Sequence, residues 1–283
     1  MTITGLLPDD SWTDRWDGVI IDEGVKDRLL SFCLFSLTQR ESLSIVGLPV
    51  HGLALLSGPP GTGKTTLAQG VANEAARYLH NHGLIDEILF AVVDPHAFPS
   101  EFLGESQRAV GRLFNDTLPE LASNGMPLIV LLDEVESMAV TRARASFDTN
   151  PVDVHRATNA VLTGIDRLAA EHRNVVLIAT TNEESTIDSA FLSRVDLHES
   201  FELPSEKAAA RILAMTFAEI GVFSTEDDPA IVELAVRCVK DGLDARRIRK
   251  LVLRAVVSHG PELALQPGTV QPSHLHAALD SQT

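Results

Sequence analysis

The chain has 283 residues, of which 45% are hydrophobic and 22% charged, proportions that suit a globular protein and exclude a wholly disordered one. Its 23 lysines and arginines against 39 aspartates and glutamates give a net charge of −16, which disfavours binding to nucleic acid or anionic lipid by bulk attraction. No apolar run reaches the roughly 20 residues of a transmembrane helix, the first residues lack the pattern of a secretory signal, and two cysteines make no disulfide framework, so we expect a cytoplasmic protein without membrane segments.

Helical and strand patterns alternate over the first 200 residues. After a polar start, apolar residues recur at helical spacing between residues 21 and 43. Apolar runs that predict strands cover residues 53–56, 88–93, 128–132, 175–179 and 200–203, and helical patterns between them cover 64–80, 106–122 and 155–170. Because the runs are apolar throughout and helices separate them, we expect an α/β fold with a five-stranded, mostly parallel sheet between helices.

Strand signals end at Pro204, and only helical patterns follow. These patterns cover residues 206–220, 229–239, 244–258 and 272–279. The change predicts three parts: an N-terminal segment (1–20), a large α/β domain (21–203) and a small helical domain (204–283).

A glycine-rich turn follows the first apolar strand. Residues 58–65, Gly-Pro-Pro-Gly-Thr-Gly-Lys-Thr, match the phosphate-loop pattern G-x-x-x-x-G-K followed by Ser or Thr, whereas the alternative is a loop that merely joins strand to helix. In such a loop the backbone N–H groups and the following helix N-terminus point at a polyphosphate, with Lys64 on the β- and γ-phosphates and the Thr65 hydroxyl on Mg²⁺. The residues expected to bind ATP here are Pro60, Gly61, Thr62, Gly63, Lys64, Thr65 and Thr66.

Two carboxylates end the strand predicted at 128–132. Asp133 falls at the C-terminal edge of the sheet, where ligands bind in such folds, and we expect it to hold Mg²⁺ and the nucleotide. Glu134 would polarise the attacking water, which favours hydrolysis over simple nucleotide holding. At the end of the next predicted strand, the amide of Asn182 would hold the water or the γ-phosphate; the alternative is an asparagine that caps the strand.

These motifs, in this order, resemble those of the AAA+ ATPases. Segments like 58–65 and 128–134 are the Walker A and Walker B motifs of that family, and Asn182 stands at sensor 1. The resemblance implies an ATPase that works with Mg²⁺ as a homo-hexamer. It covers roughly residues 16–283 and implies that the helical part is a lid over the nucleotide.

Two arginines acquire expected roles through the resemblance. Arg194, in the run Ala-Phe-Leu-Ser-Arg, stands where the family places the arginine finger that reaches the neighbouring subunit's γ-phosphate. Its alternative is a local ion pair on the surface. Arg246 stands at sensor 2, where it would report the γ-phosphate to the lid, and its choice over Arg247 and Arg249 rests on the resemblance alone.

In particular, the sequence resembles the pachytene-checkpoint or thyroid-receptor-interactor branch, which remodels HORMA-domain proteins. Residues 133–137, 159–166 and 242–251 are similar to its extended Walker B motif, the helix after it and its sensor 2 segment, and residues 16–19 to its entry into the adenine pocket. Only 57 residues precede Gly58, as in short bacterial members that are associated with the CBASS anti-phage systems. The resemblance thus implies a HORMA-domain substrate, with a nucleotidyltransferase as a further partner.

An apolar pair, Phe102 and Leu103, lies in the loop after the second predicted strand, between acidic residues and a glycine. In the family this is the pore loop that grips a threaded chain; the alternative is a pair packed into the core. The leading hypothesis is a hexameric ATPase that threads HORMA-domain proteins and so switches off a second-messenger synthase. The alternatives are a DNA loader or initiator, an unfoldase that serves a protease, and a scaffold without turnover.

Overall fold

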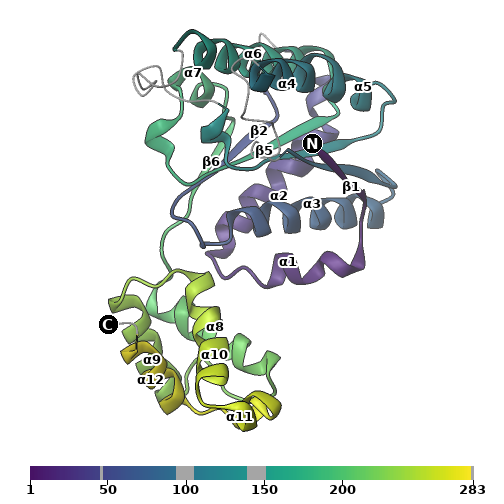
Figure 1. Cartoon of the computed structure of the whole chain (residues 1–283). Coiled ribbons are helices and arrows are strands. Elements are labelled where there is room, and N and C mark those ends of the chain that lie inside the picture. The colour runs from purple at the N-terminus through teal and green to yellow at the C-terminus, as the bar shows by residue number, and fades with distance from the viewer. Residues whose placement is uncertain (45–46, 94–104, 139–150, 282–283) are drawn as a thin grey trace. The chain divides into compact units, whose positions relative to one another are not determined.

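The computed structural model describes residues 1–44, 47–93, 105–138 and 151–281, the side chains of 105–108 and 151–157 excepted (Figure 1). The chain divides into two compact units. The first comprises Met1–Gly58 and Lys64–Ser200, and the second Pro59–Gly63 and Phe201–Thr283.

Within the described residues, the first unit contains a six-stranded sheet (Figure 1). Its strands are β1 (Thr2–Leu7), β2 (Leu53–Ser57), β3 (Ile88–Val93), β4 (Leu128–Leu132), β5 (Val175–Thr181) and β6 (Leu197–Ser200). They lie in the order β1-β3-β4-β5-β2-β6, and every neighbouring pair is parallel except β1 with β3. The predicted α/β fold with a mostly parallel sheet is confirmed, but the sheet has one strand more than the five expected.

The two edge strands differ most from the prediction. The segment expected to be a polar start forms β1, whose residues are mostly exposed and therefore lack a continuous apolar run. The last strand, β6, ends at Ser200 instead of spanning 200–203, and its residues alternate between exposed and buried. A strand at an edge is covered less completely, so hydrophobicity alone marks it poorly.

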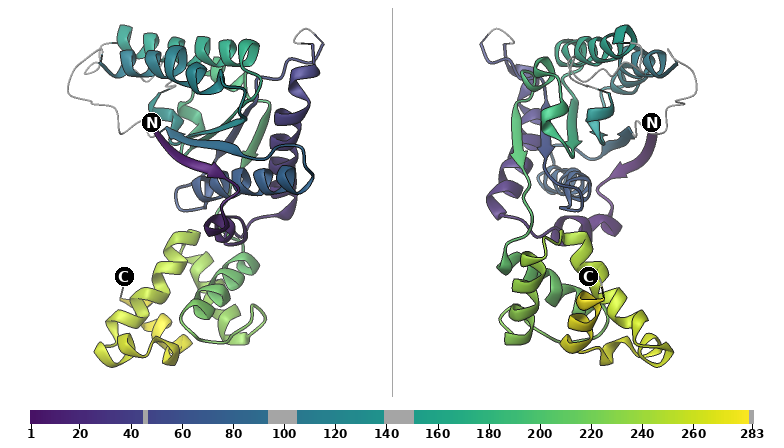
Figure 2. Two further views of the ribbon diagram at one scale, coloured as in Figure 1. Left: turned by 90° about the vertical axis from the view of Figure 1, so that its right-hand side faces the viewer. Right: turned by 60° about the vertical axis from the view of Figure 1, so that its left-hand side comes forward.

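Helices cover both faces of the sheet (Figure 2). One face carries α1 (Thr13–Asp17), α2 (Glu23–Thr38) and α3 (Lys64–Asn81), and the other carries α4 (Glu105–Arg112), α5 (Leu118–Ala122) and α6 (Pro151–Glu171). Every residue of β2, β4 and β5 is buried, because each of these strands is central and covered on both sides. Phe114 is fully buried in the core and lies so close to Gly164 of α6 that a Cβ at position 164 would come within 2.3 Å of its side chain.

The described part of the second unit is helical from Glu206 onward, with no strand. Its helices are α8 (Glu206–Glu219), α9 (Pro229–Lys240), α10 (Ala245–Ser258), α11 (Pro261–Leu265) and α12 (Pro272–Asp280). Side-chain caps define three starts: Ser205 accepts from Ala208, Asp228 from Ala230, and Asp244 from Arg247. Across both units, no described helix is long and apolar enough to span a membrane.

The two cysteines lie in these cores. Cys33 in α2 and Cys238 in α9 are fully buried free thiols. Burial raises the pKa of Cys33 to about 12 and that of Cys238 to about 11. Because the thiolate is the reactive form, we expect neither cysteine to react with dithionitrobenzoate in the folded protein near pH 8, and both to react once guanidinium unfolds it. Stoichiometric labelling of the folded protein within minutes would contradict this.

Candidate active site

Lys64, the last residue but one of the phosphate loop, is also the first residue of α3, and its ammonium is held there by hydrogen bonds. The residue is only 5% exposed, so its charge requires polar partners. Its Nζ donates to the carbonyl oxygen of Gly58 at 2.7 Å and to Oδ1 of Asn182 at 3.1 Å. A phosphate that binds at this position would accept charge-assisted hydrogen bonds from the same ammonium.

A pair of oxygen ligands lies beside Lys64. The hydroxyl of Thr65 donates to Oδ1 of Asp133 at 2.8 Å, and the same carboxylate oxygen accepts from the Thr180 hydroxyl at 2.6 Å. Hydroxyl and carboxylate oxygens fit Mg²⁺, which usually takes one or two protein carboxylates and completes its shell with phosphate and water. The described residues contain no group of three or more His, Cys, Asp or Glu side chains that could hold a metal ion.

Glu134 has an unusual backbone. Among described residues other than glycine, it alone has a positive φ, 51°, in the left-handed region. That conformation costs on the order of 1–2 kcal/mol and is concentrated at functional sites. The Glu134 N–H donates to Oγ1 of Thr180 at 3.1 Å, and its Oε1 accepts from Nδ2 of Asn182 at 3.3 Å. The strained turn therefore directs the carboxylate toward the end of β5.

The side-chain amide of Asn182 contacts both Lys64 and Glu134 and so links the phosphate loop with the residue that follows Asp133. Its own N–H donates to Oε1 of Glu136 at 3.1 Å, which orients the turn after β5. Two of these supporting residues were not predicted as parts of the site. Thr180 directly follows the strand predicted at 175–179, and Glu136 belongs to the segment 133–137 that resembles an extended Walker B motif, but neither residue was assigned a role.

The tip of the phosphate loop, Pro59–Gly63, belongs to the second unit. Within that unit the Thr62 hydroxyl donates to the carbonyl of Pro59 at 2.9 Å. The N–H of Arg246, in the first turn of α10, donates to the carbonyl of Gly61 at 3.2 Å. Thr66, in the first unit, is exposed on α3.

Arg194 lies just after α7 (Ser189–Leu192) and forms an ion pair within its own chain. Its Nε and Nη2 donate to the two carboxylate oxygens of Asp166 at 2.6 and 2.7 Å, and Nη1 donates to the carbonyl of Ala190 at 2.6 Å. The bond with Asp166 raises the pKa of Arg194 above its ordinary value. The guanidinium is therefore firmly charged, and in the single chain it occupies a local bidentate pair.

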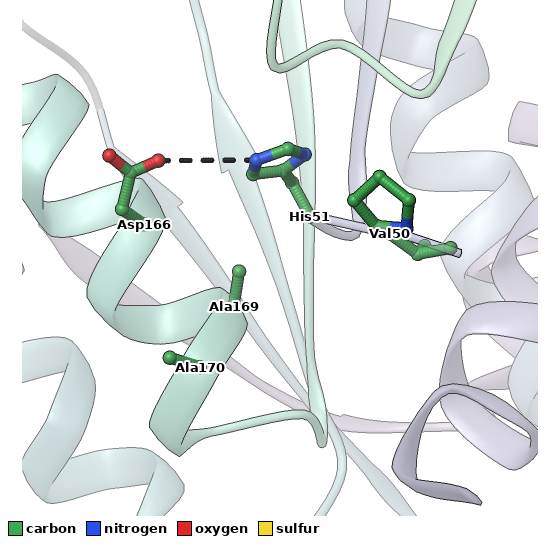
Figure 3. Close-up of a pocket in the computed structure, with 6 residues that line it drawn as sticks. Val50, His51, Asp166, Ala169 and Ala170 are labelled. Carbon is green, nitrogen blue, oxygen red and sulfur yellow. Dashed lines mark ion pairs between the residues drawn. The ribbon is translucent and has the colours of Figure 1, made fainter. Parts of the chain in front are cut away.

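A small pocket of about 220 Å³ is lined in part by Asp166, the partner of Arg194 (Figure 3). Its lining residues are Pro49, Val50, His51, Asp166, Ala169 and Ala170. The imidazole of His51 faces the Asp166 carboxylate across it, with Nε2 4.0 Å from Oδ1. The expected pore-loop residues, Phe102 and Leu103, lie outside the described residues.

Comparison with known proteins identifies the family. The model of the "ATPase family associated with various cellular activities (AAA)" matches residues 54–203. The chain belongs to the AAA family of ATPases. Family membership implies nucleotide binding and ATPase activity in general.

Curated relatives narrow the position within the family. CD-NTase-associated protein 6 of Pseudomonas aeruginosa is 41% identical over 280 residues, 96% of this chain and 89% of that protein. The pachytene checkpoint protein 2 homologue of Danio rerio is 31% identical over 76% of this chain, and the putative protein of Caenorhabditis elegans is 33% identical over 76%. The chain spans about half the length of these pachytene checkpoint relatives. The predicted resemblance to this branch is confirmed.

Solved structures show the same fold. PCH-2 of C. elegans has a TM-score of 0.77 at 26% identity and is matched over 98% of this chain and 74% of its own. A chain of the E. coli MS115-1 HORMA:CdnC:Trip13 complex has a TM-score of 0.80 over 99% of this chain and 95% of that one. At 18% identity, the second likeness bears on the fold alone.

Proposed function

We propose that this chain is an ATP-driven remodeller that unfolds or disassembles complexes of a HORMA-domain protein. ATP hydrolysis is supported above all by the contact of Asn182 with both Lys64 and Glu134. The bonded pair of Thr65 and Asp133 lies beside these residues. The HORMA-domain substrate is proposed from the resemblance to the pachytene-checkpoint branch, whose relatives in Danio rerio and Caenorhabditis elegans are 31% and 33% identical to this chain. A nucleotidyltransferase is proposed as a further partner because a relative with 41% identity is named for its association with a CD-NTase.

Hydrolysis would divide among the residues of the first unit and the loop. Lys64 and the loop amides bind the phosphates, and Thr65 and Asp133 hold Mg²⁺, which neutralises phosphate charge when bound. Glu134 accepts the proton of the attacking water, and Asn182 orients that water or the γ-phosphate. Thr180 keeps the Asp133 carboxylate and the Glu134 backbone in place through its two hydrogen bonds.

Coupling to movement requires a neighbour and a lid. In this proposal the subunits form a cytoplasmic homo-hexamer, and Arg194 exchanges Asp166 for the γ-phosphate of the next subunit. In the same proposal the nucleotide-binding domain ends at residue 203 and the lid begins at residue 204, and Arg246 on α10 reports the γ-phosphate to that lid. Phe102 and Leu103 grip the substrate in the central pore through sequence-tolerant apolar contacts.

Replacing Phe102 by alanine tests the threading step. We expect Phe102→Ala to hydrolyse ATP within about twofold of wild type, because Phe102 belongs to none of the nucleotide-binding motifs, yet to release no HORMA protein. The probe is a purified complex of a HORMA-domain protein with its nucleotidyltransferase, from a genome that encodes this chain. Release is followed by gel filtration.

The matched control is Phe223→Ala, which removes a phenylalanine that is 97% exposed in the second unit and should change neither readout. Release by Phe102→Ala at the wild-type rate would refute threading by this residue. A wild-type protein that hydrolyses ATP but leaves the complex intact would refute the HORMA substrate.

A further inference from the structure

The last residue before the phosphate loop, Ser57, is the centre of a polar cluster on β2 and β6. Ser57 is 2% exposed. Its hydroxyl oxygen lies 2.8 Å from Nε2 of His198, 3.2 Å from Oε2 of Glu184 and 3.3 Å from Oγ of Ser200. The parallel register pairs Ser57 with Ser200 and Leu55 with His198, so alternate residues of β6 reach the same hydroxyl.

The proton positions in this cluster follow from its chemistry. An ionised carboxylate only accepts, so Ser57 donates its single proton to Glu184 and accepts from its two other neighbours. Nε2 of His198 must therefore carry a proton, which it directs at Ser57 and, at 3.4 Å, at Glu184. The hydroxyl of Ser57 is thereby saturated and its side chain held in one orientation.

This cluster is not a hydrolytic triad. In a triad the acid contacts the histidine nitrogen opposite to the one that faces the nucleophile. Here the same nitrogen of His198 faces both Ser57 and Glu184. Ser57 is also too buried to meet a substrate. The cluster is therefore arranged to hold the backbone and not to attack a bond.

Two short stretches of chain connect the cluster around Ser57 with Lys64 and Asn182 of the candidate active site. Ser57 precedes Gly58, whose carbonyl accepts from Lys64 at 2.7 Å. Glu184 is two residues after Asn182, whose side chain also accepts from Lys64. A closed ring thus runs from Lys64 through the Gly58 carbonyl, the Ser57–Glu184 bond and Asn182 back to Lys64.

We propose that His198 and Glu184 are positioning residues for the phosphate loop. By holding the Ser57 hydroxyl, they set the position of the Gly58 carbonyl and so the position of Lys64 relative to Asn182. This inference rests on the hydrolytic roles proposed above for Lys64 and Asn182. None of the three cluster residues, Ser57, Glu184 and His198, belongs to the phosphate-loop, Walker B or sensor motifs.

The segment that carries His198 is attached to β2 at its other end as well. Oδ2 of Asp196 accepts from the N–H groups of Gly52 and Leu53 at 2.7 and 3.0 Å. Arg194 lies two residues before Asp196. The stretch from Asp196 to His198 therefore runs along β2 with a polar attachment at each end, and it begins two residues after Arg194.

Hydrogen–deuterium exchange of the whole protein without nucleotide tests the positioning. In His198→Ala we expect the peptide spanning residues 56–66 to exchange about fivefold faster, because one hydrogen bond no longer holds the loop, while peptides from β4 and β5 keep their protection. His198→Gln, whose amide can donate from nearly the same place, should restore slow exchange. His82→Ala, which removes an exposed histidine elsewhere in the first unit, should have no effect.

Steady-state kinetics add a second readout. His198→Ala should lower kcat for ATP hydrolysis roughly tenfold with KM within about twofold, because a displaced Lys64 weakens the transition state more than ground-state binding. In a Ser57→Ala background the same change should add no further loss, since the hydroxyl that His198 holds is gone.

Several outcomes would overturn the proposal: wild-type exchange of residues 56–66 in His198→Ala, faster exchange throughout the first unit, or failure of His198→Gln to restore the loop. Failure of the proposed function looks different. If the wild-type protein hydrolyses no ATP, the proposed ATPase activity is wrong. If deuterium exchange of residues 56–66 still responds to the His198 variants as expected, the positioning role of His198 is nevertheless supported.

Discussion

Replacing Glu134 by glutamine is expected to stop ATP hydrolysis while ATP still binds. Glutamine has the same shape and can keep a hydrogen bond with Asn182, but it cannot take a proton from the attacking water. Loss of a general base costs about 10²- to 10⁴-fold, so we expect kcat to fall by at least about a hundredfold. Because Lys64, Thr65 and Asp133 are untouched, the dissociation constant for ATP should stay within about threefold.

Phosphate release gives kcat, and titration with a fluorescent ATP analogue gives affinity. Glu120→Gln is the matched control, because it makes the same chemical change at an exposed position on α5. Turnover of Glu134→Gln within about tenfold of wild type would contradict the role of Glu134 as general base. Loss of ATP binding would show that Glu134 mainly supports the fold of the site.

Replacing Arg194 by alanine is expected to have an equally large effect, through the neighbouring subunit. An arginine supplied in trans to phosphoryl transfer contributes about 10³- to 10⁵-fold in kcat, so Arg194→Ala should lose at least about a thousandfold. Asp166 binds the guanidinium bidentately in the single chain, and a phosphate could accept the same two hydrogen bonds in its place. Arg167→Ala is the control, because Arg167 also pairs with a carboxylate, Glu171, at 2.9 Å.

Mixed assemblies distinguish action in trans from a local structural role. A subunit with Arg194→Ala keeps its own Glu134, and a subunit with Glu134→Gln keeps its Arg194. When the two inactive variants are co-expressed in one ring, some sites combine the Glu134 of an Arg194→Ala subunit with the Arg194 of a neighbouring Glu134→Gln subunit. These mixed sites should restore a substantial fraction of wild-type hydrolysis. A mixture no more active than either variant alone would contradict the arginine finger and leave Arg194 as the partner of Asp166.

Much of the nucleotide site could be anticipated because its residues belong to short motifs at strand ends. Residues 58–65 indicate a phosphate-binding turn because their glycines, lysine and threonine have the spacing that such a turn requires. Asp133, Glu134 and Asn182 each follow an apolar run. In a parallel sheet the carboxyl ends of neighbouring strands meet at one edge, and the structure brings Lys64, Glu134 and Asn182 together there. A central strand is covered on both faces, so its sequence is apolar and easily recognised.

Pairings between distant residues could not be read from such motifs. The bond of Ser57 with His198 joins residues 141 positions apart, and it exists because β6 lies beside β2 at one particular register. In the same way, Arg194 meets Asp166 only after α6 has packed above the sheet, and β1 joins β3 as an edge strand without an apolar run. Local patterns specify the chemistry of each segment. Strand order and register specify which segments face one another. The chain adopts the order and register that leave the least apolar surface exposed and the fewest buried polar groups unpaired, and these quantities depend on all segments together.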